Sequence, residues 1–470
     1  MICLLSGGFR GWMMLRLVGT QVESLFDEVL PVGVRELPPD LAGLDGLLRD
    51  ESLLAPIERA WQTAARDHGR PTIAMATFVR LMVVKQRCGW GYEALVREVS
   101  DSLHLRRFCL LALTERAPDE STVRKLVRRL GPEVVDEITR AVIGKAQRET
   151  RFLARAARID STVVEADVRY PSDAVLALDG ARALARQGRV LARRLRRPST
   201  RVVDRSRQIG KTVRLISRSL ARRTGRRTEE VVGLNARAGR AMARSIREAR
   251  RLAAQARAAA RGRGAQAKLR AARELDALAD RCQRVATQIQ QRLRGEQITD
   301  RVVSIADPDA RPIRKGKLGR PNEFGYVAQI VEVTANTRRG ARGFVLPAAS
   351  AIGNAGENTL LARTAVELAR LSLQPREVAV DGAFGPQMTQ DQLAQLAPER
   401  VFVAGRHEPG SRRTRKRLAR YRTGAEGRIS HLKRGYGLRR SRLKGYEGQQ
   451  IWTGWAILAY NLDTLAVHSA

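Results

Sequence analysis

The sequence predicts a mixed α/β protein in which an all-helical region comes first and a long helical insert interrupts the α/β part. Three observations lead to this prediction. Residues 50–150 carry apolar side chains at helical spacing, residues from 158 onward alternate between β-rich runs and helical patterns, and residues 181–295 are rich in Ala and Arg and almost free of aromatic side chains. With 470 residues the chain is long enough for two or three domains.

The region before residue 150 is expected to be a group of helices. Its clearest helix follows Pro118, with Asp119 or Ser121 as the N-cap and Gly131 as the stop. The apolar stripe of this helix consists of Val123, Leu126, Val127 and Leu130. The opposite face carries Arg124, Lys125, Arg128 and Arg129. Such a basic face suits contact with DNA, and it equally suits plain exposure to solvent.

The α/β part begins with RIDSTVVEADV at 158–168, a β-rich run that predicts a strand. Further strands are expected at 301–307, 324–335, 376–382 and 400–405, with helices at 357–371 and 389–397. A basic helix and the apolar run IWTGWAILAYNLDTLAV finish the chain. That run contains Asn461 and Asp463 and is short for a membrane span, so a buried helix is expected.

The insert is expected to form helices that fold back on each other like a coiled-coil hairpin. Its apolar residues Leu275, Leu278, Cys282, Val285 and Ile289 step by 3, 4, 3 and 4, which is the spacing of a packed seam. A shorter seam of the same kind consists of Val213, Ile216 and Leu220. The alternative is partial disorder, because ARAAARGRGAQAK holds few large apolar residues.

Charge points to a polyanionic partner. The formal net charge is +38 and the isoelectric point is near 11.4, which favours nucleic acid over a membrane surface. Aromatic residues are only 4%, so phosphate contacts by Arg and Lys are a better expectation than stacking on bases. No two of the four cysteines have C-x-x-C spacing, which argues against a zinc site or a disulfide framework. The first residues form no signal peptide, so a cytoplasmic, DNA-associated protein is expected.

Three carboxylates occupy positions suited to chemistry. Asp160 lies in the first strand, Asp381 ends the run Val378-Ala379-Val380, and Glu426 lies in the basic helix. Carboxylates from separate elements could hold hard cations such as Mg²⁺, because these prefer oxygen ligands. Taken singly, each has another explanation: a local bend for Asp160, a turn for Asp381, and an ion pair with Arg422 for Glu426.

The surroundings of Glu426 strengthen the hypothesis that this carboxylate holds a cation beside DNA. On a helix, Arg422, Glu426, Ser430 and Lys433 fall along one face. Gly424 and Gly427 flank the carboxylate, although each costs about 1 kcal/mol relative to Ala in a helix. Glycines at these positions would let a DNA backbone approach closely.

This segment resembles the signature Y-x(2)-R-x(3)-E-x(6)-K of DDE transposases from bacterial insertion sequences. Arg422, Glu426 and Lys433 match it in type and spacing, while Ala419 stands where the Tyr belongs and Tyr421 lies two residues on. RIDSTVVEA resembles the family's first-Asp strand, AVDGAFG its second, and PDESTVRKLVRRL the end of its N-terminal helical domain. The distance from the second Asp to the Glu is short, and the insert lies before the second Asp, which departs from the family's usual arrangement.

The resemblance implies an RNase H-like catalytic domain with Asp160, Asp381 and Glu426 as a triad that holds two Mg²⁺ ions, or Mn²⁺ in their place. It implies that Arg422 and Lys433 hold phosphates at the element's end. The expected boundaries are an N-terminal extension at 1–49, a helical DNA-binding domain at 50–150, the catalytic domain at 151–180 and 296–470, and the insert at 181–295.

The function expected from these features is DNA transposition. The protein would bind the ends of a mobile element, cleave a strand, and join the freed 3′-hydroxyl to target DNA. Its partners would be double-stranded DNA at the element's ends and at the target, and further copies of itself. Two alternatives stay open: a non-catalytic DNA-binding protein derived from a transposase, and a metal-dependent nuclease of the same fold.

Overall fold

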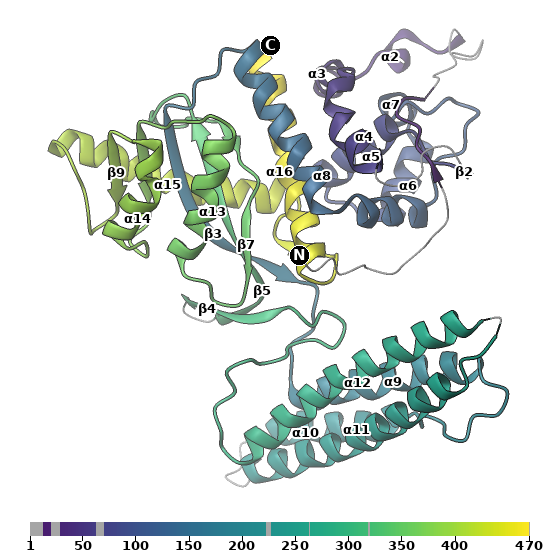
Figure 1. Ribbon diagram of the computed structural model, residues 1–470. Helices are drawn as coiled ribbons and strands as arrows, with labels where there is room; N and C mark the ends of the chain where they lie inside the picture. Colours follow the sequence, from purple (N-terminus) through teal and green to yellow (C-terminus); the bar gives the residue numbers. More distant parts are fainter. Residues whose placement is uncertain are drawn as a thin grey trace. The chain divides into compact units, whose positions relative to one another are not determined.

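The structure is a computed structural model that describes residues 13–19, 29–62, 70–221, 227–262, 264–317 and 320–469. Residues 1–12 lie outside these ranges, and they are most of the segment on which the expectation of no signal peptide rests. The chain divides into two compact units (Figure 1). Unit 1 comprises Met1–Glu165 and Tyr326–Ala470, and unit 2 comprises Ala166–Gly325.

The N-terminal part of unit 1 is helical, as the sequence predicted. Its elements are α2 (Val32–Arg35), α3 (Pro39–Leu48), α4 (Ala55–Gln62), α5 (Met75–Cys88), α6 (Tyr92–Asp101), α7 (Leu103–Phe108) and α8 (Glu120–Glu149), with a 3-10 turn at Glu51–Leu54 and a short β1–β2 pair at Met13–Met14 and Arg70–Pro71. The Asp119 side chain caps α8 by accepting a hydrogen bond from the Ser121 amide. Gly131, at φ 72°, interrupts α8 just before Pro132, which agrees with the predicted stop.

The rest of unit 1 is a mixed sheet with helices. Its strands are β3 (Ala156–Ala166), β5 (Arg320–Thr334), β6 (Phe344–Val345), β7 (Ala349–Ile352), β8 (Glu377–Val380), β9 (Arg400–Val403) and β10 (Arg440–Ser441). Only the part of β5 from Tyr326 onward belongs to unit 1. They run in the order β5–β3–β8–β9, with β6 and β7 antiparallel to β5 and with β3, β8 and β9 parallel. The helices are α13 (Glu357–Arg370), α14 (Pro386–Leu393), α15 (Arg412–Gly435) and α16 (Tyr446–Ser469), with a 3-10 turn at Ala394–Leu396. This confirms the predicted mixed α/β class.

One hydrophobic core serves both the helical region and the sheet. The apolar α16 contacts α3, α5 and α8 as well as β6, β7 and β10. Phe78 of α5 meets Trp455 of α16 edge to face at 5.7 Å between ring centroids. Leu44 of α3 is fully buried in the same core, although the sequence analysis left α3 in the N-terminal extension. The region expected as a separate helical domain therefore shares its core with the sheet.

Unit 2 is a group of four long helices, α9 (Asp173–Ala192), α10 (Ser206–Ala221), α11 (Arg227–Ala258) and α12 (Ala265–Leu293), which Figure 1 shows alongside one another. Helix α11 contacts the other three. All five residues of the predicted Leu275–Ile289 seam are buried. The compact unit begins at Ala166 and ends at Gly325, so it includes all of α9 and is longer than the expected insert.

Two sequence predictions in unit 2 are wrong. Leu220 is 55% exposed, because the buried stripe of α10 runs through Ile209, Thr212, Ile216 and Ser219. Residues 301–307 form no strand; Val302 and Ile305 are buried against the four helices, so their apolar character reflects helix packing rather than sheet pairing. The strand of this region is β4 (Arg311–Lys317), which pairs antiparallel with the first residues of β5.

Across the described ranges, no helix combines the length and apolar character needed to cross a membrane.

Candidate functional site

Asp160 and Asp381 lie side by side at the centre of the sheet. Strands β3 and β8 are parallel, with Ile159 opposite Val380, so Asp160 within β3 lies next to Asp381, which directly follows β8. Asp160 Oδ1 accepts the Ser161 amide at 2.8 Å, and Asp381 Oδ1 accepts the Ala383 amide at 2.5 Å. The fold thus brings together two carboxylates that are far apart in sequence.

The Asp160 carboxyl is held in an unfavourable environment for a negative charge. Burial and the negative charges of Asp381 and Glu357 raise the pKa of Asp160 to about 6, while Arg422 opposes the shift. Glu357, in the first turn of α13, also accepts a hydrogen bond from the Ser161 hydroxyl. Sequence reasoning missed Glu357; its only signal was an acidic residue that opens a helix. The site is therefore rich in carboxylates that repel one another.

Glu426 stands apart from this pair. Its side chain is 58% exposed on α15 and forms an ion pair with Arg422 at 3.0 Å. Within the described residues, no three or more His, Cys, Asp or Glu side chains are grouped closely enough to hold a metal ion. Arg422 connects the two parts, since it pairs with Glu426 and its charge also acts on Asp160. The structure thus brings Asp160 and Asp381 together and leaves Glu426 on the other side of Arg422.

Two further residues of α15 bear on the signature, namely Lys433 and the nearby Tyr421. Lys433 is half-buried. Tyr421 is buried, with its hydroxyl 2.6 Å from Thr334 Oγ1 and its ring 5.1 Å below the Arg158 guanidinium. Tyr421 therefore belongs to the contact between α15 and the sheet and does not replace the tyrosine expected at position 419.

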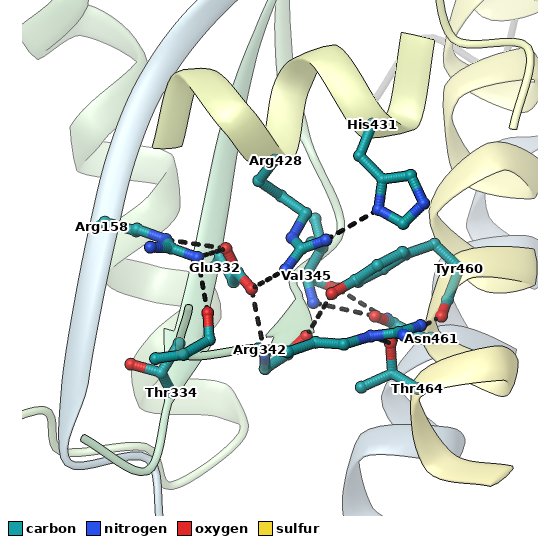
Figure 2. A network of polar contacts seen from close by, with 12 residues as sticks. Arg158, Glu332, Thr334, Arg342, Val345, Arg428, His431, Tyr460, Asn461 and Thr464 are labelled. Carbon is teal, nitrogen blue, oxygen red and sulfur yellow. Dashed lines mark hydrogen bonds and ion pairs between the residues drawn. The ribbon is translucent and has the colours of Figure 1, made fainter. Parts of the chain in front are cut away.

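A buried carboxylate anchors α15 to the sheet. Glu332 of β5 is 1% exposed and accepts hydrogen bonds from Arg158 Nε and Nη2 at 2.8 and 2.6 Å (Figure 2). Its other oxygen accepts the Gly343 amide at 3.0 Å and lies 2.9 Å from Arg428 Nη2. A buried charge is costly unless it is paired and hydrogen-bonded, and Glu332 meets both conditions.

These partners lie next to the candidate site on both sides. Arg158 precedes Asp160 by two residues on β3, and Arg428 follows Glu426 by two residues on α15. Glu332 therefore ties the strand that carries Asp160 to the helix that carries Glu426. Sequence reasoning missed it, although a single carboxylate inside the apolar run VAQIVEVTA was a usable signal.

The contact extends from α15 toward α16. Arg428 Nη1 lies 2.9 Å from His431 Nδ1, and its guanidinium is 4.6 Å from the Tyr460 ring centroid. The Tyr460 hydroxyl donates to the Gly343 carbonyl at 2.8 Å, and Asn461 exchanges two hydrogen bonds with the backbone of Val345 (Figure 2). One polar network thus joins α15, α16 and the β5–β6 edge of the sheet.

Gly424 has a structural reason that the sequence analysis did not foresee. A Cβ at this position would overlap the Arg158 guanidinium, which Glu332 and the Ala341 carbonyl hold in place. Gly427 has open space around it. The space beside Gly424 is thus filled by the protein itself, and only Gly427 leaves room for an outside backbone.

The basic face of α8 is exposed as predicted, with the four cations Arg124, Lys125, Arg128 and Arg129 outward and their apolar stripe buried. These cations already have partners in the chain. Arg124 pairs with Glu120 at 2.9 Å, Arg128 donates to the Lys444 carbonyl at 3.0 Å, and Arg129 lies 3.9 Å from the Trp61 ring centroid. Any DNA contact by this face competes with these interactions.

Comparison with known proteins finds a match in this helical region. Residues 40–129, from α3 to the first half of α8, match the family model described as a transposase domain, DUF772. The match supports the resemblance to transposases of the insertion-sequence type, and it includes the basic face of α8. No curated protein and no solved structure matches the chain.

Gly424 and Gly427 of α15 give a matched test of the Arg158 contact. Gly427→Ala should raise the free energy of unfolding by up to about 1 kcal/mol, because Ala is the better helix former and the space is open. Gly424→Ala should lower it, because the new methyl group displaces the Arg158 guanidinium from Glu332. Urea denaturation of both variants measures the difference, and equal stabilisation by both would contradict the described contact.

The Asp160 environment predicts a pH-dependent effect of removing its charge. With the folded-state pKa near 6 against 3.8 as the ordinary value, the folded state binds more protons between these pH values, and stability falls as pH rises through this window. Asp160→Asn should therefore stabilise the protein at pH 8 by about 1–3 kcal/mol. The gain should disappear below about pH 4.

Thermal melting in EDTA from pH 4 to pH 8 measures this effect. Asp391→Asn, at an exposed carboxylate of α14, is the control and should change stability by less than about 0.5 kcal/mol. A stabilisation by Asp160→Asn that is the same at pH 4 and pH 8 would show that the raised pKa is not its cause.

Proposed function

We propose that the protein is a DDE transposase in which Asp160, Asp381 and Glu426 form the catalytic triad. One observation carries the proposal: Asp160 in β3 and Asp381 directly after β8 lie next to each other on adjacent parallel strands, and Arg422 of α15 acts on Asp160 and pairs with Glu426, in a chain whose residues 40–129 match a transposase-domain model. The mixed sheet with flanking helices agrees with an RNase H-like catalytic domain, which is part of the proposal.

The donor atoms suit a hard divalent cation. Asp160 and Asp381 supply carboxylate oxygens, which Mg²⁺ and Mn²⁺ prefer. Burial and the negative charge of Asp381 raise the pKa of Asp160, and a positive charge between the two carboxylates would offset their repulsion. When bound, a pair of such cations activates the attacking oxygen and stabilises the leaving oxygen of a phosphodiester.

Glu426 has to leave Arg422 in order to join the two aspartates. An exposed ion pair of this kind contributes only about 0.3–0.5 kcal/mol on a helix, so the exchange is inexpensive. A DNA phosphate offers Arg422 a new partner, because a guanidinium pairs well with phosphate oxygens. In this account Arg422 and Lys433 hold the phosphates at the element's end, and DNA binding itself frees Glu426.

The remaining assignments follow from the same proposal. The α8 face of Arg124, Lys125, Arg128 and Arg129 contacts the element's end, the joined product forms on target DNA, and copies of the protein assemble on the two ends.

A second candidate is a non-catalytic DNA-binding protein derived from a transposase. The ion pair between Glu426 and Arg422 favours this alternative, since it gives Glu426 a purely structural role.

Cleavage of labelled element-end DNA with Mg²⁺ or Mn²⁺ separates these functions. Asp160→Asn, Asp381→Asn and Glu426→Gln should each abolish cleavage and strand joining and leave DNA binding intact, because each removes a cation ligand and no phosphate contact. Double variants should be no worse than single ones, since effects within one catalytic unit are not additive.

Glu399→Gln is the control for Glu426→Gln, because Glu399 is also an exposed carboxylate, 52% accessible, that lies near arginines. It should cleave like the wild type. Wild-type cleavage by Glu426→Gln would return Glu426 to a simple ion pair, and cleavage without strand joining by the wild-type protein would indicate a nuclease.

A further inference from the structure

Most of the chain's excess positive charge lies in the helical unit. Residues 166–325 hold 40 Lys and Arg against 15 Asp and Glu, a net charge of +25 of the total +38. The two segments of unit 1, although longer together, contribute only +13. The unit that has no counterpart in the family resemblance is therefore the most basic part of the protein.

This charge is arranged in stripes along the helices. On α11 the arginines step by 3, 4, 3 and 4, so they share one face of the helix. They are Arg237, Arg240, Arg244, Arg247 and Arg251, and all five are exposed. The opposite face of α11 is buried, with Ala241, Met242 and Ile246 among its residues. The stripe extends along about 21 Å of helix.

The neighbouring helix α10 repeats the arrangement. Its exposed cations step by 4, 3 and 4 and are Arg207, Lys211, Arg214 and Arg218. Helices α10 and α11 pack against each other. Unit 2 thus exposes two basic stripes on adjacent helices.

The carboxylates of unit 2 form their ion pairs outside these stripes, although the charge of Arg244 also acts on Glu248. Arg205 pairs with Glu248, Arg250 with Asp280, and Arg257 with Asp276, all outside the stripes. None of the nine stripe cations forms an ion pair with another described residue. Like charges at spacings of three and four destabilise a helix by about 0.2–0.5 kcal/mol a pair, so the stripes carry a cost that a bound polyanion would offset.

We propose that the exposed faces of α10 and α11 bind the sugar–phosphate backbone of duplex DNA. The proposal deepens the proposed function, and it rests on that function for the choice of DNA over RNA. Eight of the nine stripe cations are arginines, whose planar guanidinium matches phosphate oxygens. Since duplex DNA carries about one negative charge per 1.7 Å of axis, the α11 stripe is long enough to meet several phosphates.

Such binding would be independent of base sequence. Phosphate contacts position a protein on DNA and carry no base information, and the contacts proposed for the stripes are to phosphates. Recognition of the element's end would then remain with other parts of the chain. The helical unit would hold flanking or target DNA during strand transfer.

The test compares two full-length variants that lose the same number of charges. The stripe variant changes Arg237, Arg240, Arg244, Arg247 and Arg251 to Gln, which keeps helix propensity. The matched control changes five exposed arginines of unit 2 that are already paired with carboxylates, namely Arg169, Arg250, Arg257, Arg284 and Arg294. Circular dichroism and thermal melting confirm that both variants fold.

Affinity for a duplex of scrambled sequence is measured in EDTA over a range of salt concentrations. If all five arginines contact phosphates, the slope of log K against log salt should become shallower by about 4.5 in the stripe variant. Affinity should fall at least about tenfold near physiological salt, and clearly less in the control.

Equal losses in the two variants would overturn the proposal, because net charge alone would then explain binding. Unchanged binding by the stripe variant would overturn it as well, and so would preferential competition by duplex RNA. The binding assay in EDTA requires no cation and no cleavage. If the stripe variant binds DNA as the control does, this proposal alone is contradicted. If the triad variants still cleave DNA, only the proposed function is contradicted.

Discussion

The buried Glu332 carboxylate is the constraint on which the candidate site depends. A carboxylate that is 1% exposed cannot remain charged in the core without cationic partners, and Glu332 has two, Arg158 and Arg428. Breaking such a buried pair on one side leaves an unpaired charge and costs about 3–5 kcal/mol. The sheet and α15 are therefore held in one relative position. This also fixes where Asp160 on β3 lies relative to the part of α15 that carries Glu426.

The same constraint explains why Asp160 and Asp381 lack a cationic partner of their own among the described residues. Arg158 and Arg428 are committed to Glu332, so they cannot neutralise Asp160 or Asp381. Arg422 is the nearby cation that the carboxylates share, paired with Glu426 and acting on Asp160. A carboxylate pair that repels itself, beside a third carboxylate held only by an exposed ion pair, is poised to accept positive charge. The proposed catalysis rests on this balance and does not need a preassembled cluster of three carboxylates.

Sequence patterns located most of the strands of unit 1 and the positions of Asp160 and Asp381 on or beside them, because these are local signals. The run before Asp381 and the seam around Leu278 could be read from spacing alone, and both lie where expected. Partners distant in sequence could not be read in this way. Glu332 and the close contact between Gly424 and Arg158 depend on how α15 packs on the sheet, which no local pattern encodes. The same limitation explains the strand wrongly expected at 301–307, whose apolar residues pack on helices.

The central claim is that Glu426 joins Asp160 and Asp381 around divalent cations when DNA is bound. The most direct measurement is radical cleavage of the DNA-bound protein by Fe²⁺ in place of Mg²⁺, with the cut sites mapped by mass spectrometry. The account predicts backbone cuts near all three residues, suppressed by excess Mg²⁺. Cuts near Asp160 and Asp381 without any near Glu426 would contradict it and leave Glu426 as the partner of Arg422.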